Sequence, residues 1–192
     1  MLPLSAILEL DKQALLALNF DGGVLMDNLM WMASSKTVWV PLYLLLIYLL
    51  LRRYGWKKTL LALVIIALTI VLADQICNLF KNNLPKFRPS HNPELEGLVH
   101  IVRGYRGGKY GTVSAHAATM VSMAVLAIGT IGRRWFTWLM VASVVVICYS
   151  RIYMAYHFPV DIALGAMVGL VSGGSMMALY RALERRRKRI TN

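Results

Sequence analysis

The sequence predicts an all-α fold: an integral membrane bundle of five to six transmembrane helices, with a helix in the membrane interface at its N-terminus. Two observations predict it. Hydrophobic residues make up 58% of the 192 residues, and the mean hydropathy of +0.57 is typical of a membrane protein. The apolar residues also form runs close to the roughly 20 residues that cross a bilayer. No linker or repeat interrupts these runs, so we expect a single domain over residues 1–192.

The N-terminal region, residues 1–35, differs from the rest because charges interrupt its apolar residues. Residues 4–19 combine leucines with Glu9 and Asp11 at helical spacing, a pattern typical of a helix that lies in the membrane interface. Residues 24–33 are compatible with a second interfacial helix or with a lead into the first span.

Five later runs are long enough, or nearly long enough, to cross the membrane. They cover residues 37–52, 58–80, 113–131, 135–151 and 158–180. The last run has a glycine at every fourth position, at Gly165, Gly169 and Gly173. This stripe of small residues predicts close packing against another helix.

The basic residues predict the orientation, because cytoplasmic loops of membrane proteins are enriched in Lys and Arg. If the first span runs inward, twelve of the 21 basic residues lie inside, including those of the tail 181–192. We expect a bacterial inner-membrane protein with a cytoplasmic C-terminus, whose 81–114 loop and 150–161 turn face the periplasm. Anionic lipid around the tail explains the net charge of +12, which therefore does not indicate nucleic-acid binding.

Polar residues collect at the periplasmic ends of three predicted helices, where lipid would penalise them. They are Lys81, Arg88, Ser114, His116, Arg151, His157 and Asp161. The three cations suit an anion with several oxygens, which they can hold by charge-assisted hydrogen bonds, with the serine hydroxyl as a neutral donor. The sequence therefore predicts a phosphate site.

Two of these residues have the spacing of a catalytic pair. His157 and Asp161 are four residues apart, so they are neighbours on one face of a helix. The carboxylate can hold one ring nitrogen and leave the other free to attack phosphorus. We interpret His157 as a nucleophile that forms a phosphohistidine, and His116 as the acid for the leaving group and later the base for water. Each residue alone has an ordinary explanation, as a helix cap or an interfacial anchor, but the convergence of three segments favours catalysis.

Other catalytic chemistries fit these residues less well. Magnesium needs several carboxylate oxygens, and the outer helix ends offer only Asp161, with Glu94 and Glu96 in mid-loop. A zinc site is a weaker alternative because the four histidines lie among many cations. The GxSxG motif of serine hydrolases is missing. We therefore expect neither a metal nor an organic cofactor.

The same three segments carry motifs with fixed spacing. Lys81 and Arg88 fit the pattern Lys, six residues, Arg-Pro in KNNLPKFRP, and the usual Pro-Ser-Gly-His is replaced by VSAH, with Val113 and Ala115 as the differences. The pattern Ser-Arg, five residues, His, three residues, Asp is met in full within 150–161. Together these motifs resemble the signature of the type 2 phosphatidic acid phosphatase superfamily, which also includes vanadium haloperoxidases.

The resemblance implies a metal-independent lipid phosphatase with the roles assigned above. It implies phosphate ligands at Lys81, Arg88, Ser114 and Arg151, an acid and base at His116, a nucleophile at His157 and its partner at Asp161. The glycine-rich segment RGYRGGKYG adds Arg103, Arg106 and Lys109. This segment is either a cationic gate that meets a phosphorylated headgroup or a surface loop that lies against anionic lipid.

The expected partners are the bilayer and a lipid phosphate, and the oligomeric state is not determined by the sequence. Our first choice of substrate is undecaprenyl diphosphate, followed by a lipid A phosphate and then by phosphatidylglycerophosphate or phosphatidic acid. A non-enzymatic transporter or binding protein for anionic lipid is the alternative class, although the internal repeats and broken helices common in transporters are missing from the sequence.

Overall fold

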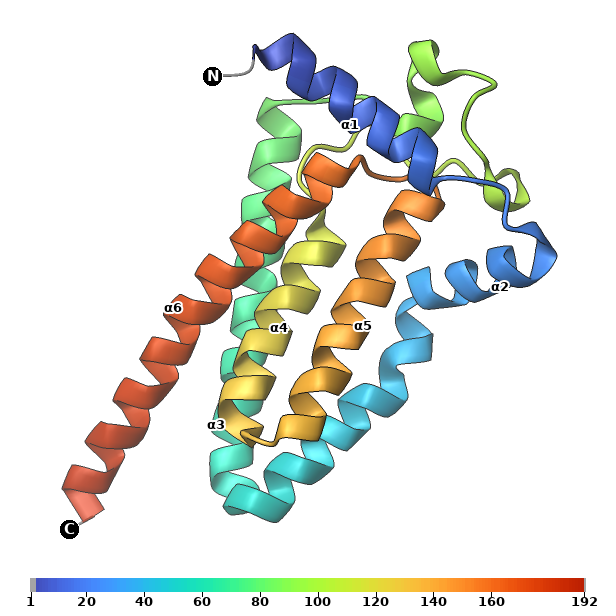
Figure 1. Ribbon diagram of the computed structural model, residues 1–192. Helices are drawn as coiled ribbons and strands as arrows, with labels where there is room; N and C mark the ends of the chain where they lie inside the picture. Colours follow the sequence, from blue (N-terminus) through green and yellow to red (C-terminus); the bar gives the residue numbers. More distant parts are fainter. Residues whose placement is uncertain (1–2, 192) are drawn as a thin grey trace.

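Helices form nearly all of the regular structure in the computed structural model (Figure 1), which describes residues 3–191 apart from the side chains of Leu4 and of residues 188–191. Two cations of the predicted tail, Lys188 and Arg189, thus have side chains outside the described part. The longer helices are α1 (Leu4–Leu18), α2 (Gly23–Ser34), α3 (Val40–Asn83), α4 (Ala115–Ile131), α5 (Arg134–Tyr153) and α6 (Pro159–Thr191). Short 3-10 turns lie at Lys36–Trp39, Pro89–His91, Pro93–Leu95 and Val102–Gly104.

The helix α3 consists of two arms, 40–54 and 56–83, that run in opposite directions along the bundle (Figure 1). The chain reverses at Gly55, whose φ of 68° and ψ of 174° are not helical. Glycine suits this position because it has no Cβ to resist a positive φ. The two arms correspond to the first two predicted spans, and the break between them is confirmed.

Within the described residues, three helices, α3, α5 and α6, are long and apolar enough to cross a membrane. The helix α4 is apolar but has only 17 residues. The all-helical class is therefore confirmed, and the count of five to six spans stays a prediction. The α3 arms, α4, α5 and α6 occupy the five predicted runs, so the bundle has the expected elements in the expected order.

The helix α4 is the centre of the bundle, where it contacts α3, α5 and α6. Its contact with α6 is the closest, because glycines of α6 face the α4 backbone. A Cβ at Gly165 would lie 2.5 Å from the Ser114 carbonyl oxygen, and a Cβ at Gly169 would lie 2.5 Å from that of Ala118. The predicted packing role of the glycine stripe is confirmed, and this contact sets the position of the start of α4 beside the start of α6.

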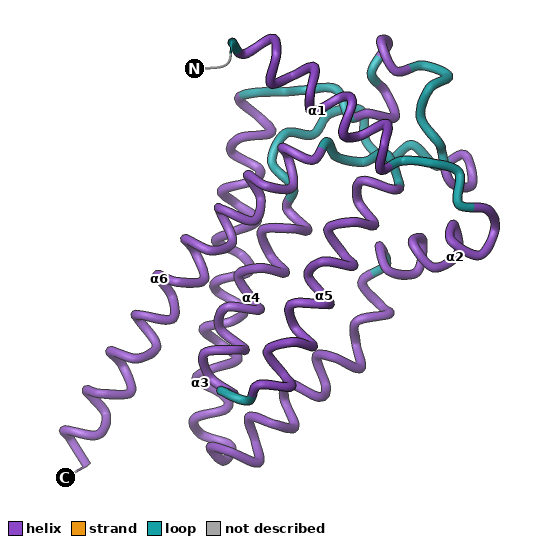
Figure 2. Tube along the Cα trace, viewed as in Figure 1, coloured by secondary structure: helices purple, strands orange, loops and turns teal. Residues whose placement is uncertain are grey.

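Most of the irregular segments and α1 cover one end of the bundle (Figure 2). The helix α1 crosses over the connection between α5 and α6 (Figure 1), where fully buried Leu15 belongs to one hydrophobic cluster with Phe158 and Ile162. Leu8 and Leu10, nearer the start of α1, are exposed, as an interfacial helix requires. One charge differs from the expected pattern: Asp11 is 5% exposed and lies at the contact with α6.

Candidate active site

The connection between α5 and α6 is a tight turn that brings Arg151 and His157 together. The Arg151 carbonyl oxygen accepts hydrogen bonds from the backbone N–H groups of Tyr156 and His157, at 3.0 and 3.2 Å. The turn requires Ala155 to adopt a φ of 53°, a left-handed conformation that costs a non-glycine residue about 1 kcal/mol. Strained backbone of this kind clusters at functional sites. The spacing of the third motif therefore has a geometric cause, because it spans one helix end, one turn and one helix start.

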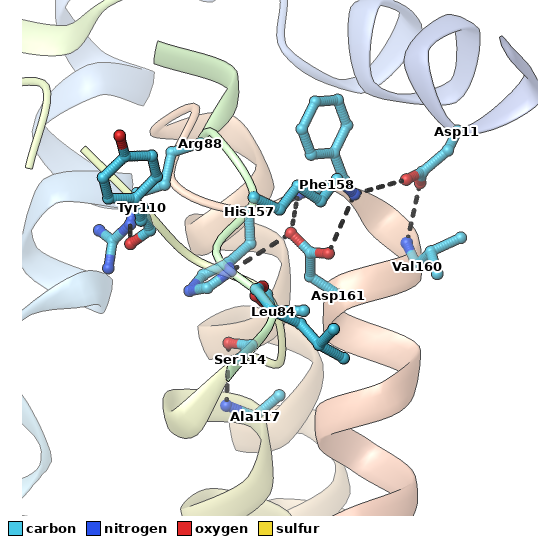
Figure 3. A network of polar contacts seen from close by, with 12 residues as sticks. Asp11, Leu84, Arg88, Tyr110, Ser114, Ala117, His157, Phe158, Val160 and Asp161 are labelled. Atoms are coloured by element: carbon cyan, nitrogen blue, oxygen red, sulfur yellow. Dashed lines mark hydrogen bonds and ion pairs between the residues drawn. The ribbon is translucent and has the colours of Figure 1, made fainter. Parts of the chain in front are cut away.

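His157 and Asp161 form the predicted pair, and both are nearly inaccessible, with exposed fractions of 4% and 3%. The Asp161 Oδ2 lies 3.5 Å from His157 Nδ1 and accepts a hydrogen bond from the Phe158 N–H at 3.0 Å (Figure 3). The His157–Asp161 distance is long and its angle does not meet hydrogen-bond geometry. Catalytic hydrogen bonds often tighten only when substrate binds.

Burial lowers the pKa of His157 from its ordinary value, and the carboxylate of Asp161 only partly opposes this effect. The cations Arg88 and Arg151 add to the lowering. His157 is therefore a neutral imidazole near pH 7. With Nδ1 facing Asp161, its Nε2 carries the lone pair that a nucleophile needs.

Two arginines approach this pair from different elements. Arg151, at the end of α5, is 7% exposed, stacks over the Tyr156 ring at 4.4 Å and donates a hydrogen bond to Ser34 Oγ. Arg88, in the long loop, lies 6.0 Å from the same ring, and its Nε donates to the Tyr110 carbonyl oxygen at 3.1 Å. The Arg151 Nε has no hydrogen-bond partner among the described residues. Tyr156 thus lies within cation–π distance of two guanidinium groups.

The start of α4 contributes the remaining predicted groups. Ser114 is fully buried and caps α4: its backbone N–H donates to the Asp161 carbonyl oxygen at 3.0 Å, and its Oγ accepts from the Ala117 N–H at 3.4 Å (Figure 3). His116 is half-buried and lies within the electrostatic reach of Arg88, Arg151 and His157. The two predicted catalytic histidines therefore occupy one site.

The glycine-rich loop lies directly against the site. A Cβ at Gly111 would be 3.1 Å from the Arg88 Nε and 3.3 Å from the His157 Cε1, and a Cβ at Gly107 would be 3.0 Å from the Arg88 guanidinium. Gly107 also has a φ of 67°. Glycine suits Gly107 because of its positive φ, and at Gly111 any side chain would be in tight contact with Arg88 and His157. This geometry favours the interpretation of the loop as a cover over the site.

Four of the predicted cations point elsewhere. Arg103 donates to Asn28 Oδ1 at 2.6 Å, Arg106 donates to the Ser90 carbonyl oxygen at 3.1 Å, and Lys109 lies 5.5 Å from the Tyr110 ring. Lys81 lies in the last turn of α3, is exposed, and has no hydrogen-bond or ion-pair partner within the described part of the chain. The structure therefore links six of the seven predicted site residues by printed interactions, and the role of Lys81 as a phosphate ligand stays a prediction.

An apolar cavity of about 570 Å³ opens beside His116. The two arms of α3 and the helix α4 form most of its wall, with apolar residues such as Tyr43, Leu46, Ile70, Met120 and Met123. Polar groups lie at its mouth and along one side: Ser34, Ser35, Lys36, Asp74, Gln75 and Thr119. This volume is within the range of small-molecule pockets, and its lining suits an acyl chain.

Potential metal ligands converge at a different place. Within the described residues, Asp21, Asp27 and His100 have ligand atoms within 4.8 Å of one another. However, the Asp27 Oδ1 already accepts hydrogen bonds from His100 at 2.8 Å and from the Tyr153 hydroxyl at 2.6 Å. This cluster is a structural network that ties α2 to α5 and to the loop.

Comparison with known proteins decides the family. A model described as the PAP2 superfamily matches residues 58–185, which includes all three motifs. This protein belongs to the PAP2 superfamily. The predicted family and enzyme class, a lipid phosphatase, are confirmed.

Two curated relatives of this PAP2 protein carry the name lipid A 4'-phosphatase. The protein from Bacteroides thetaiotaomicron is 39% identical over 168 residues, which are 86% of this chain and 74% of that protein. The protein from Porphyromonas gingivalis is 33% identical over 175 residues, 91% of this chain and 74% of that protein. The crystal structure of Aquifex aeolicus LpxE has the same fold, with a TM-score of 0.69 at 22% identity over 88% of this chain and 95% of that chain.

The PAP2 signature omits several residues that the structure brings to the site. They are Asp11, Ser34, Lys36, Lys86 and Tyr156. The sequence contains a weak indication for Lys86 and Tyr156, because each occupies a variable position within one of the motifs. The other three lie in the first 36 residues, where hydropathy indicated only an interfacial region. Their role depends on long-range contacts that no local pattern encodes.

Proposed function

We propose that this PAP2 phosphatase removes a phosphate from the sugar headgroup of a lipid A-type glycolipid at the periplasmic face of the inner membrane. The observation that carries the proposal is the meeting of His157, Asp161, Arg88 and Arg151 within electrostatic reach of His116, which itself lines an apolar cavity. A phosphate fits the cationic end and lipid chains fit the apolar end. The names of the curated relatives support lipid A as the substrate class.

In the first step, the His157 Nε2 attacks phosphorus and forms an N–P bond while the P–O bond to the sugar breaks. Arg88 and Arg151 hold the equatorial oxygens, where negative charge spreads in the transition state. His116 gives its proton to the sugar oxygen that leaves. Because burial, and to a smaller extent the nearby cations, disfavour the protonated form of His116, we expect it to take up this proton only when the phosphate anion is bound.

In the second step, water attacks the phosphohistidine. His116, now neutral, takes a proton from the water as its oxygen bonds to phosphorus and the N–P bond breaks. Inorganic phosphate leaves and His157 returns to its starting state. Asp161 stays ionised throughout and balances the positive charge that His157 carries in the intermediate.

The ranking of substrates differs from the one based on sequence. Undecaprenyl diphosphate, the first choice there, has no support among the relatives, whereas lipid A, the second choice, has. The cavity of about 570 Å³ admits part of a hydrocarbon chain, whether acyl or polyprenyl, so headgroup recognition determines the choice. Lys36 at the cavity mouth and the headgroup cations Arg103, Arg106 and Lys109 of the loop are the candidates for that recognition.

The proposal is tested by phosphate release from a lipid panel in liposomes with a chelator present. The panel contains lipid A, undecaprenyl diphosphate, phosphatidylglycerophosphate and phosphatidic acid. We expect the highest kcat/KM with lipid A, no effect of the chelator, and a loss of at least ~10³-fold in the His157→Ala variant. Equal release by wild type and His157→Ala would remove the nucleophile assignment. Binding of lipid A without release from any panel member would favour the transporter class.

A further inference from the structure

The N-terminal helix reaches the catalytic pair through Asp11. Its Oδ1 accepts a hydrogen bond from the Val160 backbone N–H at 2.9 Å, on the first turn of α6 (Figure 3). This N–H is one of the four at a helix start that have no partner within the helix. A buried carboxylate at this place stabilises the start of α6, where Asp161 lies one residue further along.

A single cation joins the two buried carboxylates. The Lys86 Nζ lies 3.2 Å from the Asp161 Oδ1 and 3.5 Å from the Asp11 Oδ2, and 4.1 Å from the centroid of the Phe158 ring. Lys86 is not one of the motif residues. Its ammonium group contacts two carboxylates and an aromatic ring. We therefore expect it to stabilise these carboxylates and not to bind the phosphate.

We infer that Asp11 and Lys86 are positioning residues of the phosphatase reaction, which fix the carboxylate of Asp161 and through it the ring of His157. The inference rests on the proposed function, because it assumes that His157 is the nucleophile. It makes α1 part of the catalytic apparatus. The chain of contacts runs from α1 through the long loop to α6, and each link is a charged group with a defined partner.

Geometry supports this role because Asp161 has separate partners for its two oxygens. Oδ2 faces the Phe158 N–H and His157, and Oδ1 faces Lys86. Without Lys86, the carboxylate would lose the contact that fixes its rotation, and two buried carboxylates would be left without their shared cation. Removal of one partner of a buried ion pair is strongly unfavourable, because the remaining charge is uncompensated.

The hydrophobic contacts of α1 hold Asp11 in place. Leu15, one turn further along α1, packs in one cluster with Phe158 and Ile162. Burial raises the pKa of Asp11, whereas its hydrogen bond from Val160 and the charge of Lys86 lower it. Lys86 therefore helps to keep Asp11 ionised.

The signs of the charges give the inference a specific test. Four ionisable groups surround His157. They are Asp161 of α6, Arg88 of the loop, Arg151 of α5 and His116 of α4, and the Asp11–Lys86 pair contacts Asp161 in turn. Loss of the Lys86 cation raises the proton affinity of the Asp161–His157 pair. Loss of the Asp11 anion lowers it. The two substitutions therefore change the pH at which the site loses its proton in opposite directions: Lys86→Met raises it and Asp11→Asn lowers it.

The experiment compares Lys86→Met, Asp11→Asn and Lys86→Arg with wild type, in the full-length protein and with lipid A in liposomes. For Lys86→Met we expect kcat to fall roughly 10- to 100-fold with KM changed less than about threefold, as for a displaced catalytic group. The acid limb of its pH profile should move to higher pH, and that of Asp11→Asn to lower pH. Lys86→Arg keeps the charge and should recover most of the activity.

Lys12→Met is the matched control, since it removes a cation from the same helix, one residue from Asp11, with Glu94 as its only ion-pair partner among the described residues. Its kcat and pH profile should equal those of wild type. A second readout is independent of turnover: in NMR titration of labelled histidine, the His157 pKa should rise in Lys86→Met and fall in Asp11→Asn.

The outcomes separate this inference from the proposed function. Equal pH profiles and equal His157 titration in all variants would overturn the inference, even if wild type hydrolyses lipid A. A loss of activity in Lys86→Met that Lys86→Arg does not recover, with an unmoved pH profile, would show a role in folding only. If wild type releases no phosphate, the proposed function fails, and the NMR titration still decides whether the two residues control the His157–Asp161 pair.

Discussion

At the scale of single residues, the candidate site combines a neutral histidine, the proposed nucleophile, with permanent cations. His157 is buried beside Asp161, and its lowered pKa keeps the ring uncharged. Arg88 and Arg151 remain protonated in any protein environment. The same burial that makes the cations effective also keeps the histidine free of a proton, so one low-dielectric pocket serves both purposes.

The lowered pKa of His157 predicts the acid limit of activity. Because only neutral His157 attacks phosphorus, kcat/KM should hold as the pH falls through 6.5, the ordinary pKa of a histidine, and decline below it. The second ionisation of a phosphate monoester, near pH 6, also lies below this point. A profile of kcat/KM measured between roughly pH 4.5 and 8 checks this expectation. A midpoint at or above 6.5 would contradict it.

The aromatic platform gives a second prediction at this scale. Tyr156→Ala removes the ring that lies 4.4 Å from Arg151 and 6.0 Å from Arg88. Cation–π contacts contribute about 0.5 to 2 kcal/mol, so we expect kcat/KM to fall by up to roughly 30-fold. Tyr156→Phe keeps the ring and should remain within a few-fold of wild type. If Tyr156→Phe loses as much as Tyr156→Ala, the hydroxyl and not the ring is the important group.

At the scale of elements, the contact between α4 and α6 sets the geometry of the site. The Ser114 N–H donates to the Asp161 carbonyl oxygen, so the N-terminal ends of the two helices are joined directly at the site. The glycines of α6 make this possible because they let the two backbones approach within contact distance. A packing feature thus determines the distance between groups that the mechanism uses.

Substitution in the glycine stripe tests this relation. A side chain at Gly169 would meet the Ala118 carbonyl oxygen at 2.5 Å and the Val121 Cβ at 2.7 Å. We expect Gly169→Leu to destabilise the protein by about 1–3 kcal/mol or more, as in overpacked cores, and to reduce phosphatase activity. Thermal unfolding in detergent and the lipid A assay measure both effects.

Gly174 provides the control for that substitution. It lies on the same helix, but a Cβ there would meet no atom within 4 Å. Gly174→Leu should therefore unfold at the wild-type temperature and keep wild-type activity. A similar loss in both variants would mean that glycine is required for the helix itself and not for its contact with α4.

At the scale of the whole molecule, the bundle has one polar, functional end and one basic end. The loops and α1 gather at the end that carries His157 (Figure 2), and α6 extends toward the opposite end, where Arg181, Arg185 and Arg186 lie near its terminus (Figure 1). This polarity agrees with the predicted orientation, in which the basic tail is cytoplasmic and the site is periplasmic.

Cysteine labelling tests the orientation. In a background with Cys77 and Cys148 replaced by alanine, Leu98→Cys places a thiol at an exposed position of the long loop, where the leucine is 62% exposed. An impermeant maleimide should label this variant in intact spheroplasts and label Arg185→Cys only after lysis. The reverse pattern would place the site on the cytoplasmic side.

The sequence by itself determined the helical membrane class, the two arms of α3, the glycine contact and six of the residues that meet at the site. These features follow from local patterns: hydropathy, the 3.6-residue period and motif spacing across a single turn. Tertiary structure alone decided that α1 contacts the start of α6 and that Lys86 joins Asp11 to Asp161. Asp11 and Asp161 are 150 positions apart in the chain. A contact over such a separation produces no periodic pattern in the residues around either aspartate. Packing of the whole chain was therefore needed to find it.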